Sequence, residues 1–358
     1  MTDGYFQRVA RETPTRLWIN NPSMDELNKA IAAGAIACTT NPTYGSKLLK
    51  SEPIYITRII DRAILETGDD DIVADSVSQE AAARLIDRFL PLYEQSGGKQ
   101  GFVTIQDDPR KEDDWERIVT VALRCRDLGP NFMAKIPVTC TGLRAIEVLI
   151  AEDVPISATE IFALDHAIAA CELYERMNAK TGRYPPFFVT HITGIFDEYL
   201  GDYVREREIP IAPDRLAWAG SSVGRAEYRL LKVRGYKTTM LGGGARGTHH
   251  FTDFVGGDIH ITINWKTAEE LIEAAPPVVS RIEMPTPADI REELMSKLPD
   301  YRRACTLGAL PVEEFAEFGP VVLFRSNFIA GYKHLVTEIG NRRAMSLETK
   351  SLAGQPAG

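Results

Sequence analysis

The stretch NFMAKIPVTCTGLRAIEVLIA, residues 131–151, joins a short apolar run to a helical pattern. Its first part, Phe132 to Pro137, has the length and apolar content of a strand buried on both faces. Its second part, Gly142 to Ala151, has apolar residues at helical spacing. Such a pair is one βα unit, which is typical of a parallel sheet covered by helices.

Similar units recur along the chain. The expected strands are Arg16 to Asn20, Ala37 to Asn41, Phe102 to Gln106, Phe132 to Pro137, Ile156 to Phe162, Phe187 to Ile192, Arg215 to Gly220 and Thr238 to Gly242. Helical patterns lie between them, for example over residues 24–33, 114–128, 166–178 and 225–233. Eight units in series favour a closed (β/α)8 barrel, or TIM barrel, over a doubly wound open sheet.

Two segments are longer than eight units require. Residues 43–100 are too long for one connection, and their periodicity predicts additional helices between strands 2 and 3. The chain after the last expected strand also has helical periodicity and predicts a helical C-terminal extension. We therefore expect a single barrel domain over residues 1–358, with its core over about 16–245 and the extension over about 246–350.

Composition narrows the range of partners. The net charge of -9 and the absence of a long basic run disfavour nucleic acid. No apolar run approaches the roughly 20 residues of a membrane span, so no membrane partner is expected. The five cysteines are odd in number and lack CxxC spacing, which predicts free thiols in a reducing compartment. We expect a cytoplasmic protein, and assembly into a homo-oligomer is left open.

Lys135 is the charged residue within the apolar run Phe132 to Pro137. If Phe132, Ala134 and Ile136 face the helices, alternation turns Met133 and Lys135 toward the barrel interior. A desolvated amine is partly neutral near pH 7 and can attack a carbonyl, which is the first step of Schiff-base chemistry. The alternative interpretation is a lysine that extends from a strand end to water.

Uncharged polar residues stand near the carboxyl ends of the other strands. They are Asn20, Asn41, Gln106, Thr159 and Thr190. Each one alone is more typical of turn capping. Because catalytic groups of a barrel gather at the carboxyl ends of its strands, the set predicts a site that recognises carbonyl and hydroxyl groups around one amine.

Four motifs then give a family resemblance. They are TTNPT at residues 39–43, KIPVT at 135–139, GLRAI at 142–146 and ISATEIF at 156–162. In this order, and on these strands, the motifs resemble the transaldolase family of class I, Schiff-base enzymes. The similarity extends over roughly residues 16–245.

The resemblance implies a reaction. Lys135 would attack the carbonyl of a ketose or ketose phosphate and, through the imine, move a dihydroxyacetone unit to an aldehyde acceptor. Asn41 would bind a hydroxyl of the retained fragment, while Gln106 and Thr159 would position a water that relays protons. The expected partner is a small sugar or sugar phosphate. No metal and no organic cofactor is expected.

Two departures from the family pattern concern the catalytic groups. Asn20 stands where the family has an aspartate that acts as base, so another group would have to supply the base, and Glu160 and His191 are local candidates. Gln106 stands where true transaldolases have a glutamate, and it resembles the fructose-6-phosphate aldolase branch. Aldolase-like cleavage is therefore an alternative function.

Further departures concern substrate binding. Ser157 replaces an asparagine, and Ile195 stands where the family has a phosphate-binding arginine, so a sugar without phosphate is a further alternative. Other anion-binding candidates follow the last two expected strands. They are Ser221, Ser222 and Arg225 after residues 215–220, and Arg246 in a glycine-rich loop after residues 238–242.

Two other classes of protein compete with this interpretation. His249, His250, Asp253, Asp258 and His260 lie close together in the sequence and could bind a metal in a barrel hydrolase or isomerase. Their spacing matches no compact ligand motif, so we favour surface or lid positions for them. A non-catalytic barrel is the second alternative. Retention of a buried amine argues against it, because such an amine lowers stability and has no evident structural role.

Overall fold

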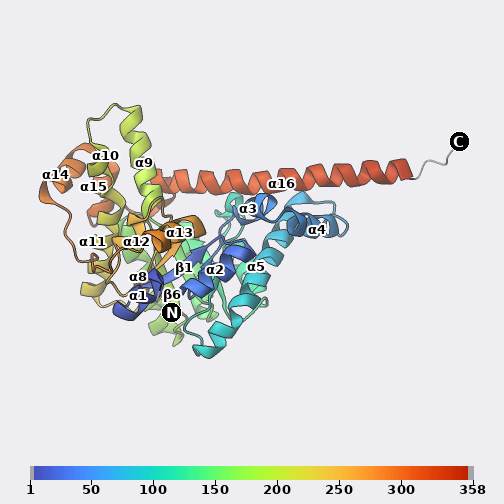
Figure 1. Ribbon diagram of the computed structural model, residues 1–358, viewed down its shortest axis with the longest axis horizontal. Helices are drawn as coiled ribbons and strands as arrows, with labels where there is room; N and C mark the ends of the chain where they lie inside the picture. Colours follow the sequence, from blue (N-terminus) through green and yellow to red (C-terminus); the bar gives the residue numbers. More distant parts are fainter. Residues whose placement is uncertain (1–3, 354–358) are drawn as a thin grey trace.

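The structure is a computed structural model that describes residues 4–353 (Figure 1). The strands in these residues close into a barrel. The strands are β1 (Arg16–Asn20), β2 (Cys38–Thr39), β3 (Val103–Ile105), β4 (Phe132–Pro137), β5 (Ile156–Ile161), β6 (Phe187–Ile192), β7 (Thr239–Gly243) and β8 (Ile259–Ile263). Neighbours pair in parallel around the barrel, and β8 pairs with β1. The expected (β/α)8 barrel is confirmed.

One expected strand is wrong. Residues 215–220 lie in α10 (Pro213–Leu216) and the start of α11 (Ala219–Arg234), because Pro213 opens a helix and the following Arg, Leu and Ala residues favour it. The strand expected as the eighth is β7, and the barrel is closed by β8, beyond the expected core boundary at residue 245. The sequence IHITI of β8 alternates as a half-buried strand should.

Helices surround the barrel, and the additional helices between β2 and β3 are confirmed. The helices before β6 are α1 (Tyr5–Glu12), α2 (Met24–Ala33), α3 (Tyr44–Ser51), α4 (Pro53–Ala63), α5 (Asp70–Gln95), η1 (Pro109–Lys111), α6 (Trp115–Arg126), α7 (Cys140–Ala151) and α8 (Leu164–Thr181). Those after β6 are α9 (Thr193–Glu206), α10, α11, α12 (His249–Thr252), α13 (Trp265–Ala274), α14 (Ala288–Lys297), α15 (Pro299–Cys305), η2 (Val312–Glu317) and α16 (Gly319–Ala353). The predicted helical C-terminal extension is therefore also confirmed.

Alternation along the strands separates two apolar cores. Phe132, Ala134 and Ile136 of β4 belong to the large core between barrel and helices. Met133 belongs to a small cluster inside the barrel, whose members are Trp18, Ala37, Phe102, Met133, Phe188 and Leu241. This inner cluster fills the barrel below Lys135, so the inward orientation predicted for Met133 is confirmed.

The turn after β4 fixes the end of the strand that carries Lys135. Thr139 caps α7 by accepting a hydrogen bond from the backbone N–H of Gly142 at 3.0 Å. A Cβ atom on Gly142 would lie 1.8 Å from the carbonyl oxygen of Pro137, so the helix can begin this close to the strand only with glycine there.

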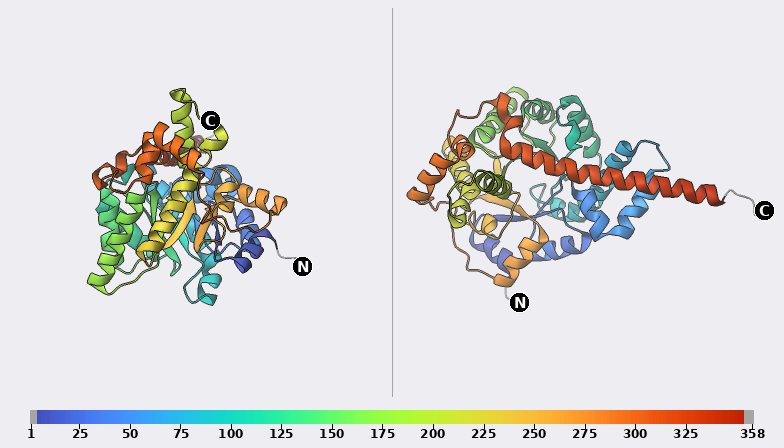
Figure 2. Two further views of the ribbon diagram at one scale, coloured as in Figure 1. Left: turned by 90° about the vertical axis from the view of Figure 1, so that its left-hand side faces the viewer. Right: turned by 90° about the horizontal axis from the view of Figure 1, so that it is seen from above.

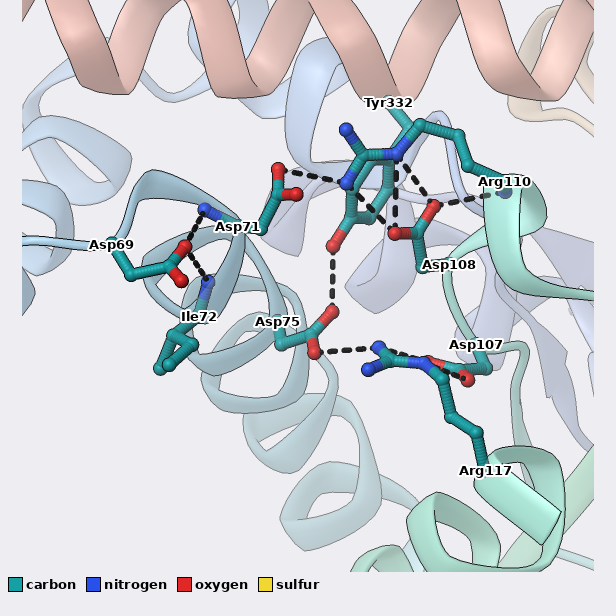
Figure 3. Close-up of polar contacts among 9 residues, drawn as sticks. All are labelled: Asp69, Asp71, Ile72, Asp75, Asp107, Asp108, Arg110, Arg117 and Tyr332. Carbon is teal, nitrogen blue, oxygen red and sulfur yellow. Dashed lines mark hydrogen bonds and ion pairs between the residues drawn. The ribbon is translucent and has the colours of Figure 1, made fainter. Parts of the chain in front are cut away.

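α16 is a long helix that crosses one end of the barrel, and Figure 2 shows this arrangement from above. It packs against α3, α5 and α9. Figure 3 shows one of its attachments, in which the Tyr332 hydroxyl donates to Asp75 of α5 at 2.6 Å. Asp75 also pairs with Arg117 at 2.8 Å, and Arg117 pairs with Asp107 just beyond β3 at 2.9 Å. The network therefore joins α16 to the loop that follows Gln106.

Two expectations drawn from composition can be compared with the fold. The five cysteines are free thiols, as predicted. None of the helices in residues 4–353 combines the length and the apolar character that crossing a membrane requires.

Candidate active site

Lys135 lies at the carboxyl-end mouth of the barrel, 7% exposed, on the wall of a cavity of about 230 Å³. Its Nζ atom donates to the backbone oxygen of Thr40 at 3.5 Å. The ring centroid of Phe328, from α16, lies 5.3 Å from the same atom. The inward orientation predicted for Lys135 is confirmed, and α16 covers the amine.

Burial changes the protonation of this amine. Desolvation lowers the pKa of Lys135 to about 8, while the nearby Glu160 acts in the opposite direction. At pH 7 about a tenth of an amine with this pKa is neutral, against roughly one part in three thousand at the ordinary pKa of a lysine. The site therefore holds a far larger fraction of nucleophilic amine than an exposed lysine would.

Asn20 lies on the same cavity, at the end of β1. The Thr39 hydroxyl donates to its Oδ1 atom at 3.0 Å and also lies 2.7 Å from the Thr262 hydroxyl. With Oδ1 engaged in this way, the amide N–H groups of Asn20 remain to bind a ligand. An amide cannot accept a proton as a carboxylate does, so Asn20 can orient a substrate but cannot serve as its base.

Asn41, just after β2, is held by its neighbours. Its Oδ1 atom accepts from Asn21 Nδ2 at 3.0 Å, from the Thr43 backbone N–H at 3.0 Å and from the Thr43 hydroxyl at 2.7 Å. The amide nitrogen of Asn41 is then the group left to donate to a substrate hydroxyl. Asn21 adopts a φ of 46°, in the left-handed region, which turns it toward Asn41.

A second set of polar side chains flanks Lys135, just after β3 and on β5, the two neighbours of β4. Gln106 Nε2 donates to Glu160 Oε1 at 3.3 Å. Within the described residues, Gln106 Oε1, Thr159 Oγ1 and Glu160 Oε2 are buried without a hydrogen-bond partner. Between β5 and β6, the hydroxyls of Ser157 and Thr190 lie 2.8 Å apart.

The structure separates the expected anion-binding residues. Arg246 lines the cavity and pairs with Glu198 at 2.8 Å, and Ile195 lines the same cavity. The other candidates, Ser221, Ser222 and Arg225, lie in helix α11 and not after a strand. Ser222 bonds the Tyr301 hydroxyl at 2.7 Å, and Arg225 pairs with Asp253 at 3.3 Å. These three residues do not line the cavity beside Lys135, because the segment that precedes them is helical and not a strand.

His191 does not face Lys135. It is fully buried, with Nδ1 3.0 Å from Glu227 Oε2 and Nε2 3.2 Å from the backbone oxygen of Gly220, both on α11. The bulge in β5 and the parity of β6 leave Thr190 on the cavity and turn His191 outward. Of the two candidate bases from the sequence, only Glu160 lies beside the amine.

The five residues considered as an alternative metal site do not gather as a unit. His260 lies inside the barrel, where its Nδ1 accepts from Trp18 Nε1 at 2.9 Å. Asp253 pairs with Arg225, and the Asp258 backbone N–H bonds the Tyr228 hydroxyl. His249 and His250 instead meet Asp197, with possible ligand atoms of the three within 4.8 Å of one another.

The hydrogen bonds of His250 indicate whether this smaller cluster is suited to bind a metal. His250 Nδ1 accepts the backbone N–H of Arg246 at 2.9 Å, so the proton of the neutral ring lies on Nε2. That proton is donated to Asp197 Oδ2 at 2.7 Å. A metal on Nε2 would require this proton to move to Nδ1 and break the bond to Arg246. We therefore assign the cluster to support of the loop after β7.

Several cavity residues were missed from the sequence. Thr39 and Thr262 line the cavity, and Thr262 belongs to the overlooked strand β8, whose alternating pattern was the available signal. Phe324, Asn327 and Phe328 line it from α16, and their spacing of three and four residues indicated one face of a helix. No sequence pattern indicated that this face would meet the barrel mouth.

A closed parallel barrel with an amine, amides and hydroxyls at its carboxyl-end mouth has the architecture of a (β/α)8-barrel enzyme. A model of the family described as Transaldolase/Fructose-6-phosphate aldolase matches residues 17–300. The chain belongs to this family.

Curated relatives agree with the family. A transaldolase of Mycobacterium ulcerans (strain Agy99) is 27% identical over 247 residues, which cover 61% of this chain and 66% of the relative. A transaldolase of Thermobifida fusca (strain YX) is 28% identical over 257 residues, covering 64% of this chain and 67% of the relative. The chain thus spans about two thirds of the length of the curated relatives it matches.

Proposed function

We propose that the protein transfers a dihydroxyacetone unit from a ketose or ketose phosphate to an aldehyde, through a Schiff base on Lys135. The observation that carries the proposal is the buried amine of Lys135 on a cavity lined by amides and hydroxyls at the barrel mouth. Membership of the transaldolase and fructose-6-phosphate aldolase family supports it. A cytoplasmic location remains a prediction from the cysteines.

The first half of the reaction makes an electron sink. The neutral amine of Lys135 attacks the ketose carbonyl to give a carbinolamine, which loses water to form an iminium ion. Gln106 and Thr159, on the strands beside β4, hold the water that relays protons in these steps, and their unpaired buried oxygens support that role.

The second half breaks and remakes a carbon-carbon bond. Electrons of the bond next to the imine carbon flow into the iminium ion, and the hydroxyl at that bond passes its proton through the held water to Glu160. An aldehyde departs, and an enamine remains on Lys135. The amide nitrogens of Asn20 and Asn41 donate to hydroxyls of the retained fragment, since their oxygens are already engaged. Phe324 and Phe328 cover the cavity and keep water from the enamine until an acceptor aldehyde arrives.

The cavity favours an anionic or uncharged polyol. Within residues 4–353, Lys135 and Arg246 are the charged residues that line it and no carboxylate does so, although the whole chain carries a net charge of -9. Arg246 can bind a phosphate group of the substrate by leaving Glu198, a rearrangement of two half-exposed side chains. Thr190 lines the cavity, and the Ser157 hydroxyl lies 2.8 Å from the Thr190 hydroxyl.

A second candidate function follows from Ile195. Its apolar side chain lies on the same cavity as Arg246, which is the one arginine among the described residues that line it. That arrangement favours a donor or acceptor without phosphate, or simple aldol cleavage with release of dihydroxyacetone. The choice among these substrates can be made by the same experiment that tests the Schiff base.

The test is borohydride trapping with a panel of ketoses, phosphorylated and not, followed by intact mass and peptide mapping. An adduct on Lys135 is expected, and the ketose that gives most adduct identifies the donor class. Lys135→Met is the matched negative control, because it preserves length and removes the amine. Absence of an adduct with every ketose would remove the proposal, as would an adduct of equal yield in Lys135→Met.

A further inference from the structure

β5 contains an irregularity beside the amine. Ala158 pairs with Val189 and Ile161 with His191, so three steps along β5 match two along β6. Glu160 sits in this bulge with a φ of 63°, a strained value for a residue with a side chain. Simple alternation would turn the residue after Thr159 toward the helices. The bulge instead aims Glu160 at Gln106, which follows β3 on the far side of β4.

The Glu160 carboxyl is thereby buried with little to stabilise a negative charge. It is fully buried, accepts one hydrogen bond from a neutral amide, and its Oε2 atom has no hydrogen-bond partner within the described residues. A carboxylate in such surroundings is costly, whereas the protonated acid is tolerated. Thr159 Oγ1 and Gln106 Oε1 are unpaired in the same way, so polar groups on β3 and β5 converge without partners beside Lys135.

We propose that Glu160 is the acid that protonates the departing oxygen when the Lys135 carbinolamine loses water, and that takes the proton back when the imine is hydrolysed. This inference rests on the Schiff base proposed above. In the forward step the carbon-oxygen bond breaks, and the nitrogen lone pair forms the carbon-nitrogen double bond. The Glu160 proton leaves with the oxygen as water, and the resulting carboxylate balances the charge of the iminium ion.

The charged groups around Glu160 agree with this role. Desolvation, with the nearby Glu112, raises the pKa of Glu160 well above that of an ordinary glutamate, while Lys135, Gln106 and Arg325 oppose the rise. Glu112 follows η1 and pairs with Arg325 of α16 at 2.9 Å, so these two largely neutralise each other. The carboxyl therefore holds a proton near neutral pH, when part of the Lys135 amine has already lost its own.

The experiment measures how fast the imine forms in the full-length protein. Dihydroxyacetone is the probe, because this three-carbon ketone forms the imine without a bond to cleave. Samples are quenched with borohydride at intervals across a pH series, and the adduct on Lys135 is quantified by mass. Glu160→Gln keeps the shape and the hydrogen bond to Gln106. Glu227→Gln is the matched control, since it removes an equally buried carboxyl that faces His191.

In the wild type we expect the rate to rise as the amine loses its proton and to fall at higher pH as the acid is lost. Glu160→Gln should form the imine about 100-fold more slowly and should lose the falling limb. Glu227→Gln should keep the wild-type rate and profile. Glu160→Asp retains the acid but shortens its reach, so it should be slower and keep the falling limb.

The outcomes distinguish the two proposals. An unchanged rate and pH profile in Glu160→Gln would overturn the role of Glu160 and leave the Schiff base standing. If Glu160→Gln does not fold, imine formation at the wild-type rate in Glu160→Asp would overturn the role of Glu160 instead. No adduct in the wild type would contradict the Schiff base itself, before any variant is compared.

Discussion

Met133 and Lys135 are two residues apart on β4, and both point into the barrel, yet they lie in layers of opposite character. The Met133 layer is apolar, with Trp18, Phe102 and Phe188 packed against one another. His260 beside them accepts a hydrogen bond from Trp18, and burial lowers its pKa to about 4, so its ring is neutral. The layer above contains the amine of Lys135 and polar atoms that have no partner within the described chain. One strand therefore serves stability with one residue and chemistry with the other.

The difference shows where the fold departs from rules that favour stability. In the lower layer, side chains are closely packed and hydrogen bonds are complete. In the upper layer, a lysine is desolvated, a carboxyl is buried without a cation bonded to it, and the backbone of Glu160 is strained. Such departures persist where surrounding structure holds them in place, and they are typical of functional sites.

Replacing the amine of the upper layer by an apolar side chain should have the largest effect on activity. We expect Lys135→Met to lower kcat on the order of 10⁴-fold, because no other amine lines the cavity to form the imine. The free energy of unfolding of the same variant should be about 1–3 kcal/mol higher than that of the wild type near pH 7, because the variant removes a charge that burial disfavours.

The pH dependence checks the cause of that gain. The pKa of Lys135 is about 8 in the folded protein and near 10.5 when unfolded, so the unfolded chain binds more protons between these values. The cost of the buried charge is fully present below about pH 8 and is relieved as the pH rises toward 10.5. Denaturant unfolding at pH 7 and at pH 10 should show the advantage of Lys135→Met shrinking, and a constant advantage would contradict the explanation.

The lower layer should respond in the opposite way. We expect Met133→Ala to lose about 2–5 kcal/mol of unfolding free energy, because it leaves a cavity among closely packed rings. The amine above it is not altered, so borohydride trapping with the best ketose should reach the wild-type yield in the folded protein. Loss of the adduct with an unchanged unfolding midpoint would show that the two layers are not separate in function.

The lower layer and the strand order were largely predictable from sequence. The alternation of side chains along any extended strand sets the inward side of β4, and seven of the eight strands in residues 4–353 overlap those expected. The error at residues 215–220 came from the short apolar run after Arg215, which is ambiguous between strand and helix, and Pro213 at a helix start was the overlooked signal. The IHITI sequence of β8 was not among the expected strands, because eight had already been assigned by residue 242.

The upper layer was predictable only where a strand end places a residue. Lys135, Asn20, Asn41 and Thr190 lie on the cavity because each is on, or just after, an inward strand position. The orientation of Glu160 depends on a bulge, which changes one backbone angle and leaves no pattern in a single sequence. Asn327 reaches the cavity through packing between segments far apart in the chain, and local periodicity does not determine such packing.

The rim of the upper layer offers a smaller and more selective test. If Arg246 binds a substrate phosphate, Arg246→Met should raise KM for a phosphorylated ketose by about 10-fold and leave KM for the free sugar unchanged. Glu198→Gln is the control, because it frees Arg246 from its partner and should lower KM for the phosphorylated sugar or leave it as it is. Equal effects of Arg246→Met on both sugars would indicate that the arginine supports the loop and does not read the anion.

The smallest expected effect concerns the helix that separates the upper layer from water. Tyr332→Phe removes the hydroxyl that donates to Asp75 and weakens the attachment of α16 by about 1 kcal/mol, since Asp75 keeps Arg117. Brief opening at Phe324 and Phe328 would then expose the enamine, and protonation would release free dihydroxyacetone in place of transfer. We expect amide hydrogen exchange in α16 to quicken about 5-fold and the released fraction of product to rise, with total kcat nearly unchanged. Faster exchange with a constant released fraction would mean that shielding comes from the cavity wall and not from α16.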